Sequence, residues 1–427
     1  MPKGFYFLIG AQFASSLADN ALLILGIYFL NEQGYPAWWA PLLKFSLTLA
    51  YVLLASVVGP LADAFSKHRL MAAMNAVKVL GVVLLLAGAH PVLAFAVIGL
   101  GAAVYAPSKY GLVTESVPPR LLVRANAWLE VSVVLSVILG IALGGALTGW
   151  VASWPQPWMI PTRDFHFEFG VHTQTLPAMG LIIAIYGVST FLNLGLTPLV
   201  KSVSLIPLTW QALRPAIFWN SHLQLWRDPL GGLSLYVTTL YWGVGAVMQF
   251  AVLLWAQQTL GMSLKSGAYF QVVVAVGVIG GAFSAGRKFK LHSARHALPW
   301  GLLLALLLPI IVLIANPWYA VVLLFAVGLA GGMLLVPMNA LLQHRGMQVL
   351  SAGRSIAVQG FNENLCVLVM LAGYSALLAQ GVSLTVIMWL VAILLIAGIA
   401  PLCMFLWRQV RTFTPRGQTG QPSSMAR

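Results

Sequence analysis

The chain has 427 residues, of which 60% are hydrophobic and 7% are charged, against roughly 25% charged residues in an ordinary soluble domain. This composition excludes a soluble globular protein and predicts a polytopic membrane protein. The net charge of +14 does not indicate nucleic-acid binding, because the Lys and Arg residues gather on one side of the predicted membrane.

Apolar runs of about 20 residues, the length needed to cross the hydrocarbon core, recur along the whole chain. We predict an all-α membrane protein with twelve transmembrane helices. The first run is too long for a cleaved signal peptide and contains Asp19, so we expect it to remain as the first span. The predicted spans are 4–30, 40–62, 69–88, 91–115, 121–148, 178–199, 231–257, 266–286, 294–314, 318–343, 350–379 and 382–407.

The distribution of the 23 Lys and Arg residues predicts the orientation. With both termini in the cytoplasm, only Arg163 and Lys265 lie outside, and Lys44, Lys78 and Lys109 lie within spans. All the others fall at cytoplasmic loops and ends, as the positive-inside rule requires. The segment 151–177, which contains Trp154 and Trp158, is then an outer loop, and we expect it to lie at the membrane surface.

Spans four and ten carry a shared pattern of residues. Adding 230 to the positions of Gly101, Pro107, Arg124 and Ala127 gives Gly331, Pro337, Arg354 and Ala357. The same offset matches Asp19 with Gln249, Lys109 with Asn339, and Glu115 with Arg345. We therefore predict two pseudo-symmetric six-helix bundles at 1–200 and 231–410, joined by a cytoplasmic linker at 201–230 and followed by a disordered tail at 411–427.

A six-plus-six repeat with both ends in the cytoplasm is similar to the major facilitator superfamily, whose substrate sites lie near the midplane between the halves. The segment GPLADAFSKHRLM at 59–71 partly resembles the cytoplasmic signature of that superfamily. Asp63 would act as a latch, either facing a helix N-terminus or pairing with a neighbouring Arg. The alternative is an ordinary positive-inside loop with one acid.

Ionisable side chains inside the predicted spans are candidates for function, because a charge at the bilayer centre costs at least about 2.5 kcal/mol on insertion scales. Asp19 lies roughly 22 Å from the inner end of its span, at 1.5 Å per residue, so we expect it to face a cavity, with Asn20 as its hydrogen-bonding neighbour. A structural ion pair is the alternative for Asp19, and snorkelling is the alternative for Lys109. Lys78 needs a partner, for which Asp63 and Glu130 are the candidates, whereas Lys44 can snorkel.

Polar residues three or four apart share a helix face, as Asn126 and Glu130 do, and they line a cavity or act as interhelical contacts. The predicted substrate-binding residues are Asp19, Asn20, Lys109, Tyr110, Asn126, Glu130, Gln249, Asn339, Gln359, Asn362 and Glu363. The predicted gating residues are Asp63, Arg69, Glu115, Arg124, Arg345 and Arg354. The histidines show no metal-ligand spacing and the chain contains no P-loop. We therefore expect no metal, no cofactor and no enzymatic activity.

Six strings along the chain resemble the lysophospholipid transporter family of Gram-negative inner membranes. They are FASSLADNALLI, GPLADAFSKHRLM, YAPSKYGLVTE, VRANAWLEVS, VPMNALLQHRG and SIAVQGFNEN. The resemblance implies a monomeric inner-membrane flippase for lysophosphatidylethanolamine and lysophosphatidylglycerol. It also implies functional coupling to an acyltransferase/acyl-carrier-protein synthetase that re-acylates both lipids. A proton-coupled drug or metabolite efflux transporter, with Asp19 or Glu363 carrying the proton, is the main alternative, and a receptor or scaffold is the third.

Overall fold

The computed structural model describes residues 1, 3–32, 34–35, 40–153, 176–196, 206–262 and 264–412, and every regular element within them is helical. Eleven of the described helices are long and apolar enough to cross a membrane, and a bent pair brings the number to twelve. The chain is therefore a multi-pass membrane protein. Most of the predicted outer loop at 151–177, and the predicted tail from residue 413 onward, lie outside the described residues.

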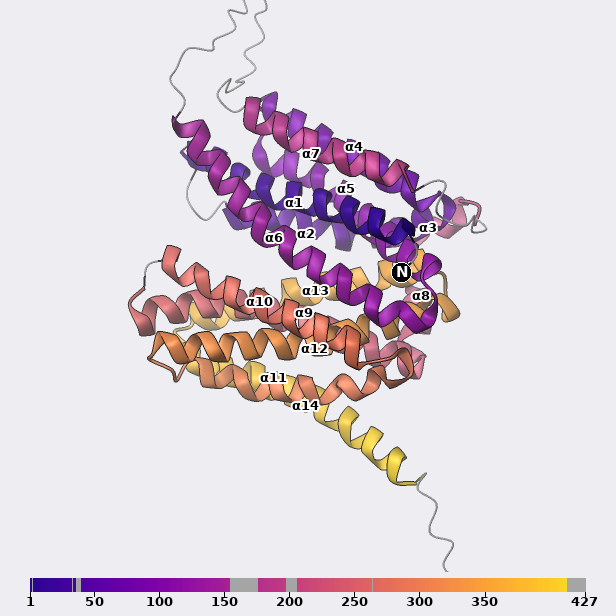
Figure 1. Cartoon of the computed structure of the whole chain (residues 1–427), viewed down its shortest axis with the longest axis vertical. Coiled ribbons are helices and arrows are strands. Elements are labelled where there is room, and N and C mark those ends of the chain that lie inside the picture. The colour runs from indigo at the N-terminus through magenta and orange to yellow at the C-terminus, as the bar shows by residue number, and fades with distance from the viewer. Residues whose placement is uncertain are drawn as a thin grey trace, which may run out of the picture.

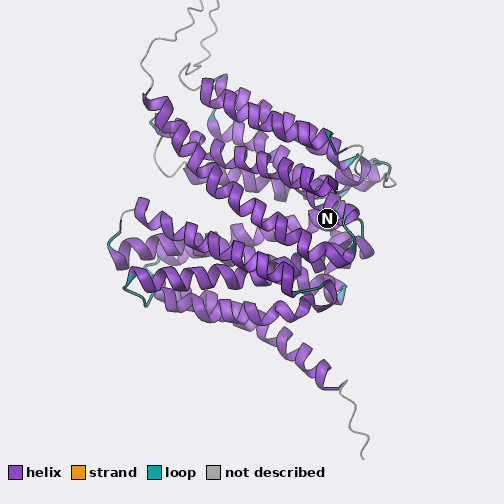
Figure 2. Ribbon diagram, viewed as in Figure 1, coloured by secondary structure: helices purple, strands orange, loops and turns teal. Residues whose placement is uncertain are grey.

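The first half of the chain forms one group of helices, drawn in indigo to magenta in the upper part of Figure 1. Figure 2 shows that all of these segments are helical. The members are α1 (Lys3–Glu32), α2 (Ala40–Leu53), α3 (Ala55–Ala64), α4 (Lys67–Leu86), α5 (Pro91–Ser116), α6 (Leu122–Ser153) and α7 (Leu176–Leu194), with the short 3-10 helix η2 (Pro119–Leu121) before α6.

The second half forms the lower group in Figure 1. Its members are α9 (Pro229–Leu260), α10 (Leu264–Lys288), η5 (Leu291–Ala297), α11 (Leu298–Ile311), α12 (Pro317–Val349), α13 (Ala352–Ala379) and α14 (Leu384–Thr412). Between the two groups, the segment predicted as a linker contains η4 (Trp210–Leu213) and α8 (Pro215–Arg227). The two halves are therefore joined by a chain that has helical structure of its own.

The second predicted span is broken. Hydropathy gives one continuous apolar run from 40 to 62, but the structure bends by 68° between α2 and α3. Leu54 at the break is non-helical, and Pro60 lies inside α3. Proline cannot donate the hydrogen bond that continues a helix, so Pro60 weakens the helix close to the break. Irregular backbone within a membrane is tolerated where neighbouring helices cover it. The bend sets α3 against α13 of the other half, where a Cβ on Gly59 would meet the Cα of Arg354 at 2.9 Å.

Glycines allow α10 and α12 to pack with their backbones in contact. A Cβ added to Gly281 would collide with the carbonyl of Leu329, and one added to Gly332 would collide with the carbonyl of Val278. Small residues four apart permit this approach in membranes, where packing rather than the hydrophobic effect holds helices together. Gly140 and Gly144 of α6 make the same kind of contact with α1.

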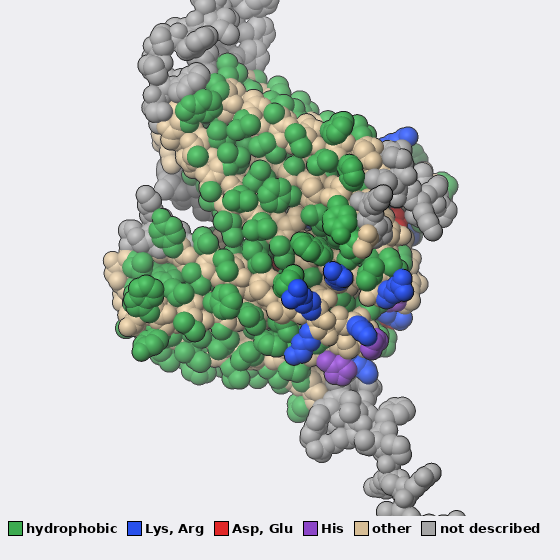
Figure 3. All heavy atoms as spheres, viewed as in Figure 1, with side chains coloured by type: hydrophobic (Ala, Val, Ile, Leu, Met, Phe, Trp, Pro, Cys, Tyr) green, Lys and Arg blue, Asp and Glu red, His purple; other side chains and the backbone are tan. Residues whose placement is uncertain are grey.

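Lys and Arg side chains gather at one end of the helices, near the N-terminus and α8 (Figure 3). We call this the basic end. The two halves are bonded to each other there by Asp63 with Ser351 and Gly353, and by Asn126 with Gln343. At the other end, Lys44 Nζ donates to Gln249 Oε1 at 3.1 Å. Among the described residues, four side-chain hydrogen bonds therefore join the halves at the basic end and one joins them at the other end.

Candidate functional site

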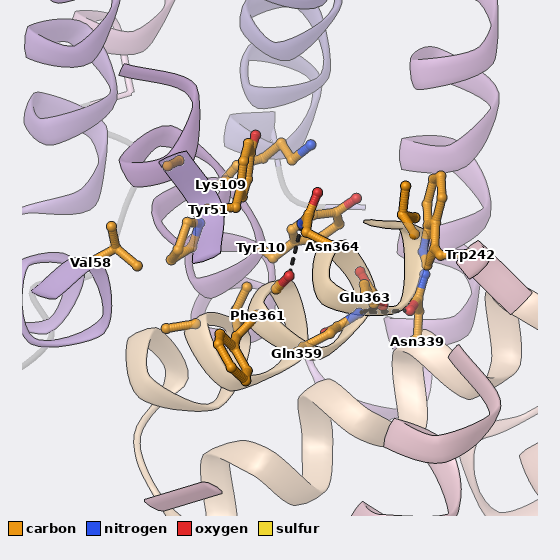
Figure 4. Close-up of a pocket in the computed structure, with 17 residues that line it drawn as sticks. Tyr51, Val58, Lys109, Tyr110, Trp242, Asn339, Gln359, Phe361, Glu363 and Asn364 are labelled. Atoms are coloured by element: carbon orange, nitrogen blue, oxygen red, sulfur yellow. Dashed lines mark hydrogen bonds between the residues drawn. The ribbon is translucent and has the colours of Figure 1, made fainter. Parts of the chain in front are cut away.

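A cavity of about 260 Å³ lies between the two halves, and helices of both contribute to its wall. Figure 4 shows Tyr51, Lys109 and Tyr110 on the side of the first half, facing Asn339, Gln359 and Glu363 of the second. The apolar part of the lining includes Val58, Trp242, Phe361 and Val367. The cavity therefore combines a polar wall with an apolar one.

Lys109 is the basic side chain in this lining, and it has no acidic partner within ion-pair distance among the described residues. It is 8% exposed. Its ammonium donates to Gln12 Oε1 at 3.3 Å and lies 4.2 Å from the centre of the Tyr110 ring. These contacts are weak compensation for a buried charge, because an ammonium offers three donors and a buried ion needs paired, hydrogen-bonded neighbours.

Two carboxylates accompany Lys109. Glu363 accepts a hydrogen bond from Gln359 Nε2 at 2.8 Å, and the same amide donates to Asn339 Oδ1 at 3.0 Å. Glu130 of α6 is 7% exposed, and among the described residues it makes no hydrogen bond and no ion pair. The charge of Lys109 acts on Glu130 through space, and Glu130 acts on Glu363 in turn. One basic and two acidic side chains are therefore grouped at or near the cavity, and Glu130 is the one without a hydrogen-bond or ion-pair partner among the described residues.

Asp19 lies in a polar cluster inside the first half. Lys78 Nζ approaches Asp19 Oδ2 at 2.7 Å, and Tyr186 OH donates to Asp19 Oδ1 at 2.6 Å. Lys78 also donates to Ser15 Oγ at 3.0 Å, and Ser15 Oγ donates to Asn75 Oδ1 at 2.9 Å. The Asp19 side chain remains 29% exposed. The ion pair that was the alternative for Asp19 is thus present.

Two sequence-based expectations in this region were wrong. Lys78 pairs with Asp19, not with Asp63 or Glu130, because the packing of α4 on α5 and α7 brings its ammonium to the middle of α1. Asn20 is not the hydrogen-bonding neighbour of Asp19, since its amide donates to the backbone oxygen of Ser16 one turn earlier, at 2.7 Å.

Six predicted substrate residues lie outside the cavity lining: Asp19, Asn20 and Glu130, described above, and Asn126, Gln249 and Asn362. Asn126 and Gln343 exchange two hydrogen bonds of 2.9 Å between α6 and α12. Gln249 is exposed and accepts from Lys44. Asn362 lies on the side of α13 that meets the linker helix, where its Oδ1 is 3.1 Å from His222 Nε2. These contacts join elements of the protein to one another.

The predicted gating residues divide into three groups at the basic end. Asp63 is 6% exposed and faces the N-terminus of α13, where it accepts from Ser351 Oγ and, at 2.8 Å, from the Gly353 N–H. Of the two arrangements expected for Asp63, the helix N-terminus is the one observed.

The second group forms ion pairs, and the third is free of them. Glu115 pairs with Lys67 at 2.6 Å. Arg345 pairs with Asp228 at 2.5 Å, which lowers the pKa of the Asp228 carboxyl. Arg69 and Arg124 are exposed, and Arg354 makes no ion pair among the described residues.

Sequence reasoning missed Gln12, Tyr51, Tyr186 and Trp242 as parts of these sites, and it named the wrong partners for Lys78. The spacing of Gln12, Ser15 and Asp19 places them on one face of α1 and was the available signal for Gln12. No signal in the sequence selects Tyr186 from the other tyrosines. The described residues contain no group of His, Cys, Asp or Glu that could hold a metal ion.

Comparisons with known proteins agree with this architecture. The family model described as Major Facilitator Superfamily matches residues 8–369. The chain is 34% identical over 368 residues to the lysophospholipid transporter LplT of Serratia proteamaculans (strain 568), covering 86% of each chain. It is 32% identical over 383 residues to LplT of Yersinia enterocolitica serotype O:8 / biotype 1B, covering 90% of this chain and 89% of that one.

Solved structures share the fold at low identity. A bacterial homologue of the iron transporter ferroportin in the outward-facing state matches with a TM-score of 0.70 and 14% identity, over 94% of this chain and 100% of that one. The transporter FucP in the outward conformation matches with a TM-score of 0.71 and 15% identity, over 94% of this chain and 98% of that one. At such identity the likeness concerns the fold alone.

Proposed function

The chain belongs to the lysophospholipid transporters of the major facilitator superfamily, and we propose that it moves lysophosphatidylethanolamine and lysophosphatidylglycerol from the outer to the inner leaflet of the inner membrane. An acyltransferase/acyl-carrier-protein synthetase would then re-acylate them. The distribution of Lys and Arg supports an orientation with both termini and the basic end in the cytoplasm.

The observation that carries this proposal is the buried, weakly paired ammonium of Lys109 at the edge of a partly apolar cavity. A lysophospholipid carries a phosphate, which a cation can hold by charge-assisted hydrogen bonds. It also carries one acyl chain, which needs apolar surroundings. The lining of Val58, Trp242, Phe361 and Val367 offers such surroundings next to Lys109. An entirely polar solute would gain nothing from that wall.

The remaining predicted binding residues are assigned here by their positions. Tyr110, Asn339, Gln359 and Glu363 line the cavity and would contact the headgroup directly. Asp19, Asn20 and Glu130 would complete the polar wall on the side of the first half. Two contacts between the halves would break and form as the two ends of the transport path open and close. They are the hydrogen bond of Lys44 with Gln249 and the pair of Asn126 with Gln343.

We assign transport to alternating access with a cavity open sideways toward lipid. The contacts of Asp63 with Ser351 and Gly353 hold the basic end closed, so the described conformation would receive substrate from the opposite side. Breaking these contacts would release the headgroup into the cytoplasmic leaflet. The pairs of Glu115 with Lys67, and of Arg345 with Asp228, would keep each half rigid during this exchange.

The test is uptake of labelled lysophosphatidylethanolamine by proteoliposomes that contain the purified protein, compared with Lys109→Gln. The variant should lose most of the uptake, because it keeps a polar, hydrogen-bonding side chain but removes the charge that would hold the phosphate. Lys288→Gln, on the last turn of α10 at the basic end, should behave as the parent. Transport of a cationic drug but of no lysophospholipid would support the efflux alternative instead.

A further inference from the structure

Three charged side chains at the centre of the molecule differ in how far the protein itself satisfies them. Lys109 has one neutral acceptor, Gln12 Oε1, at 3.3 Å. Glu363 has the Gln359 amide at 2.8 Å. Glu130 is buried, with 7% of its surface exposed, and it has no hydrogen-bond or ion-pair partner among the described residues. A buried charge without partners is destabilising unless something else completes it.

Lys109 and Glu130 can each accept a further partner from a bound ligand. The amide nitrogen of Gln12 is buried and donates to nothing, so an unused donor lies beside the ammonium of Lys109. Glu130 is not part of the cavity lining, but its oxygens are not among the fully sealed, unpaired side-chain atoms, and the charge of the cavity-lining Lys109 acts on them. One end of this array therefore offers donors to an anion, and the other offers a free carboxylate to a cation.

We propose that Glu130 determines headgroup selectivity by accepting the ammonium of an ethanolamine headgroup while Lys109, positioned by Gln12, holds the phosphate. The proposal rests on the proposed function and adds a preference within it. A zwitterionic headgroup satisfies both ends of the array. A glycerol headgroup has the phosphate but no cation, and it leaves Glu130 uncompensated.

Glu130 is assigned this role in preference to the other two intramembrane acids because of their contacts. Asp19 is already paired with the Lys78 ammonium at 2.7 Å and accepts a hydrogen bond from the Tyr186 hydroxyl at 2.6 Å, so a headgroup ammonium would have to displace that of Lys78. Glu363 accepts from Gln359, which also bonds Asn339. A headgroup ammonium gains most where no donor of the protein must be displaced, and that place is Glu130.

The experiment measures a ratio within one sample. The purified protein is reconstituted into phosphatidylcholine proteoliposomes. These receive equal amounts of lysophosphatidylethanolamine and lysophosphatidylglycerol that carry different isotopes. The parent protein should transport the ethanolamine lipid faster. Glu130→Gln should lower the ratio by about tenfold or more, the effect of losing one charge-assisted hydrogen bond, because transport of the ethanolamine lipid falls more than transport of the glycerol lipid. Glu130→Asp should restore part of the preference.

A matched control and a change of substrate separate selectivity from folding. Glu115→Gln also removes one carboxylate, but from an ion pair with Lys67 outside the cavity, and should not change the ratio. If Glu130→Gln does not insert into membranes, the parent protein is tested with N-acetylated lysophosphatidylethanolamine, which lacks the ammonium and should lose its advantage over the glycerol lipid.

Two results would overturn the inference: a ratio unchanged by Glu130→Gln, or an N-acetylated lipid transported as well as the unmodified one. Equal losses for both lipids in Glu130→Gln would also count against it, because they indicate a purely structural role. If the parent protein moves neither lipid, the proposed function itself is wrong, and this result is distinct from a failure of the selectivity assignment.

Discussion

Replacing Asp63 with Asn should open the basic end of the molecule. In the described conformation the Asp63 carboxylate accepts from Ser351 Oγ and the Gly353 N–H at the start of α13. Hydrogen bonds to charged groups contribute about 1.5–3 kcal/mol each, and a negative charge at a helix N-terminus adds up to about 2 kcal/mol in partly buried geometry. Asn retains one acceptor, so we expect a loss of about 2 kcal/mol, which changes the ratio of closed to open molecules by about thirtyfold.

The assay is thiol labelling from the basic side. Ala106 lines the cavity, so Ala106→Cys is introduced in a background in which Cys366 and Cys403 are replaced by Ala. Inside-out vesicles are then treated with a membrane-impermeant maleimide. With Asp63→Asn, labelling should accelerate by up to the same factor of about thirty, since it follows the open population.

Asp228→Asn is the matched control for this experiment. It removes an acid at the same end, but its partner Arg345 belongs to the same half of the protein, so the halves should stay together and labelling should not accelerate. An unchanged labelling rate in Asp63→Asn, or an equal acceleration in Asp228→Asn, would refute the latch.

Three further outcomes are expected. Asp19→Asn should lower the amount of protein in the membrane, because Lys78, which is 1% exposed, would lose its counter-charge at a cost of about 3–5 kcal/mol. Adding Lys78→Met should restore the amount of protein, as measured by immunoblot. No restoration would contradict the ion pair of Asp19 with Lys78. Gly281→Ala should lower the melting temperature in detergent because its Cβ meets backbone, whereas Gly280→Ala, whose Cβ has only Phe325 Cζ at 3.7 Å, should not; equal melting temperatures would count against the close packing. The lowered pKa of Asp228 contributes stability above the unfolded value of about 3.9 that is lost as pH falls through the folded pKa, so Asp228→Asn should weaken the acid dependence of the melting temperature, and an unaltered dependence would show that the carboxylate contributes nothing.

Hydropathy located nearly every span because lipid imposes a simple requirement: about 20 apolar residues with all backbone groups bonded internally. The predicted ends agree with the helices to within several residues, as for 91–115 against Pro91–Ser116. The break at Leu54 was not predicted, since its apolar run is uninterrupted and a bend changes no residue's hydropathy. The helix α8 within the linker was also not predicted. A short amphipathic segment between two bundles gives no clear helix signal in a hydropathy pattern.

The intramembrane charges were visible in the sequence for a similar reason, because each is costly in lipid and needs compensation. Helical spacing grouped those on one helix but could not say which helix lies opposite. Lys78 and Asp19 are 59 positions apart, and Asp19 and Tyr186 are 167 apart, distances over which no periodicity operates.

The sequence by itself determined the membrane class, the spans, the basic end and the short list of buried charges, because hydropathy and charge are properties of local segments. Only the tertiary structure decided that Lys78 neutralises Asp19, that Asp63 meets the start of α13, and that Lys109 and Glu130 remain without strong partners beside a cavity. Compensation of a buried charge depends on which helices pack together and at what height, and that is settled by the shapes of many side chains at once.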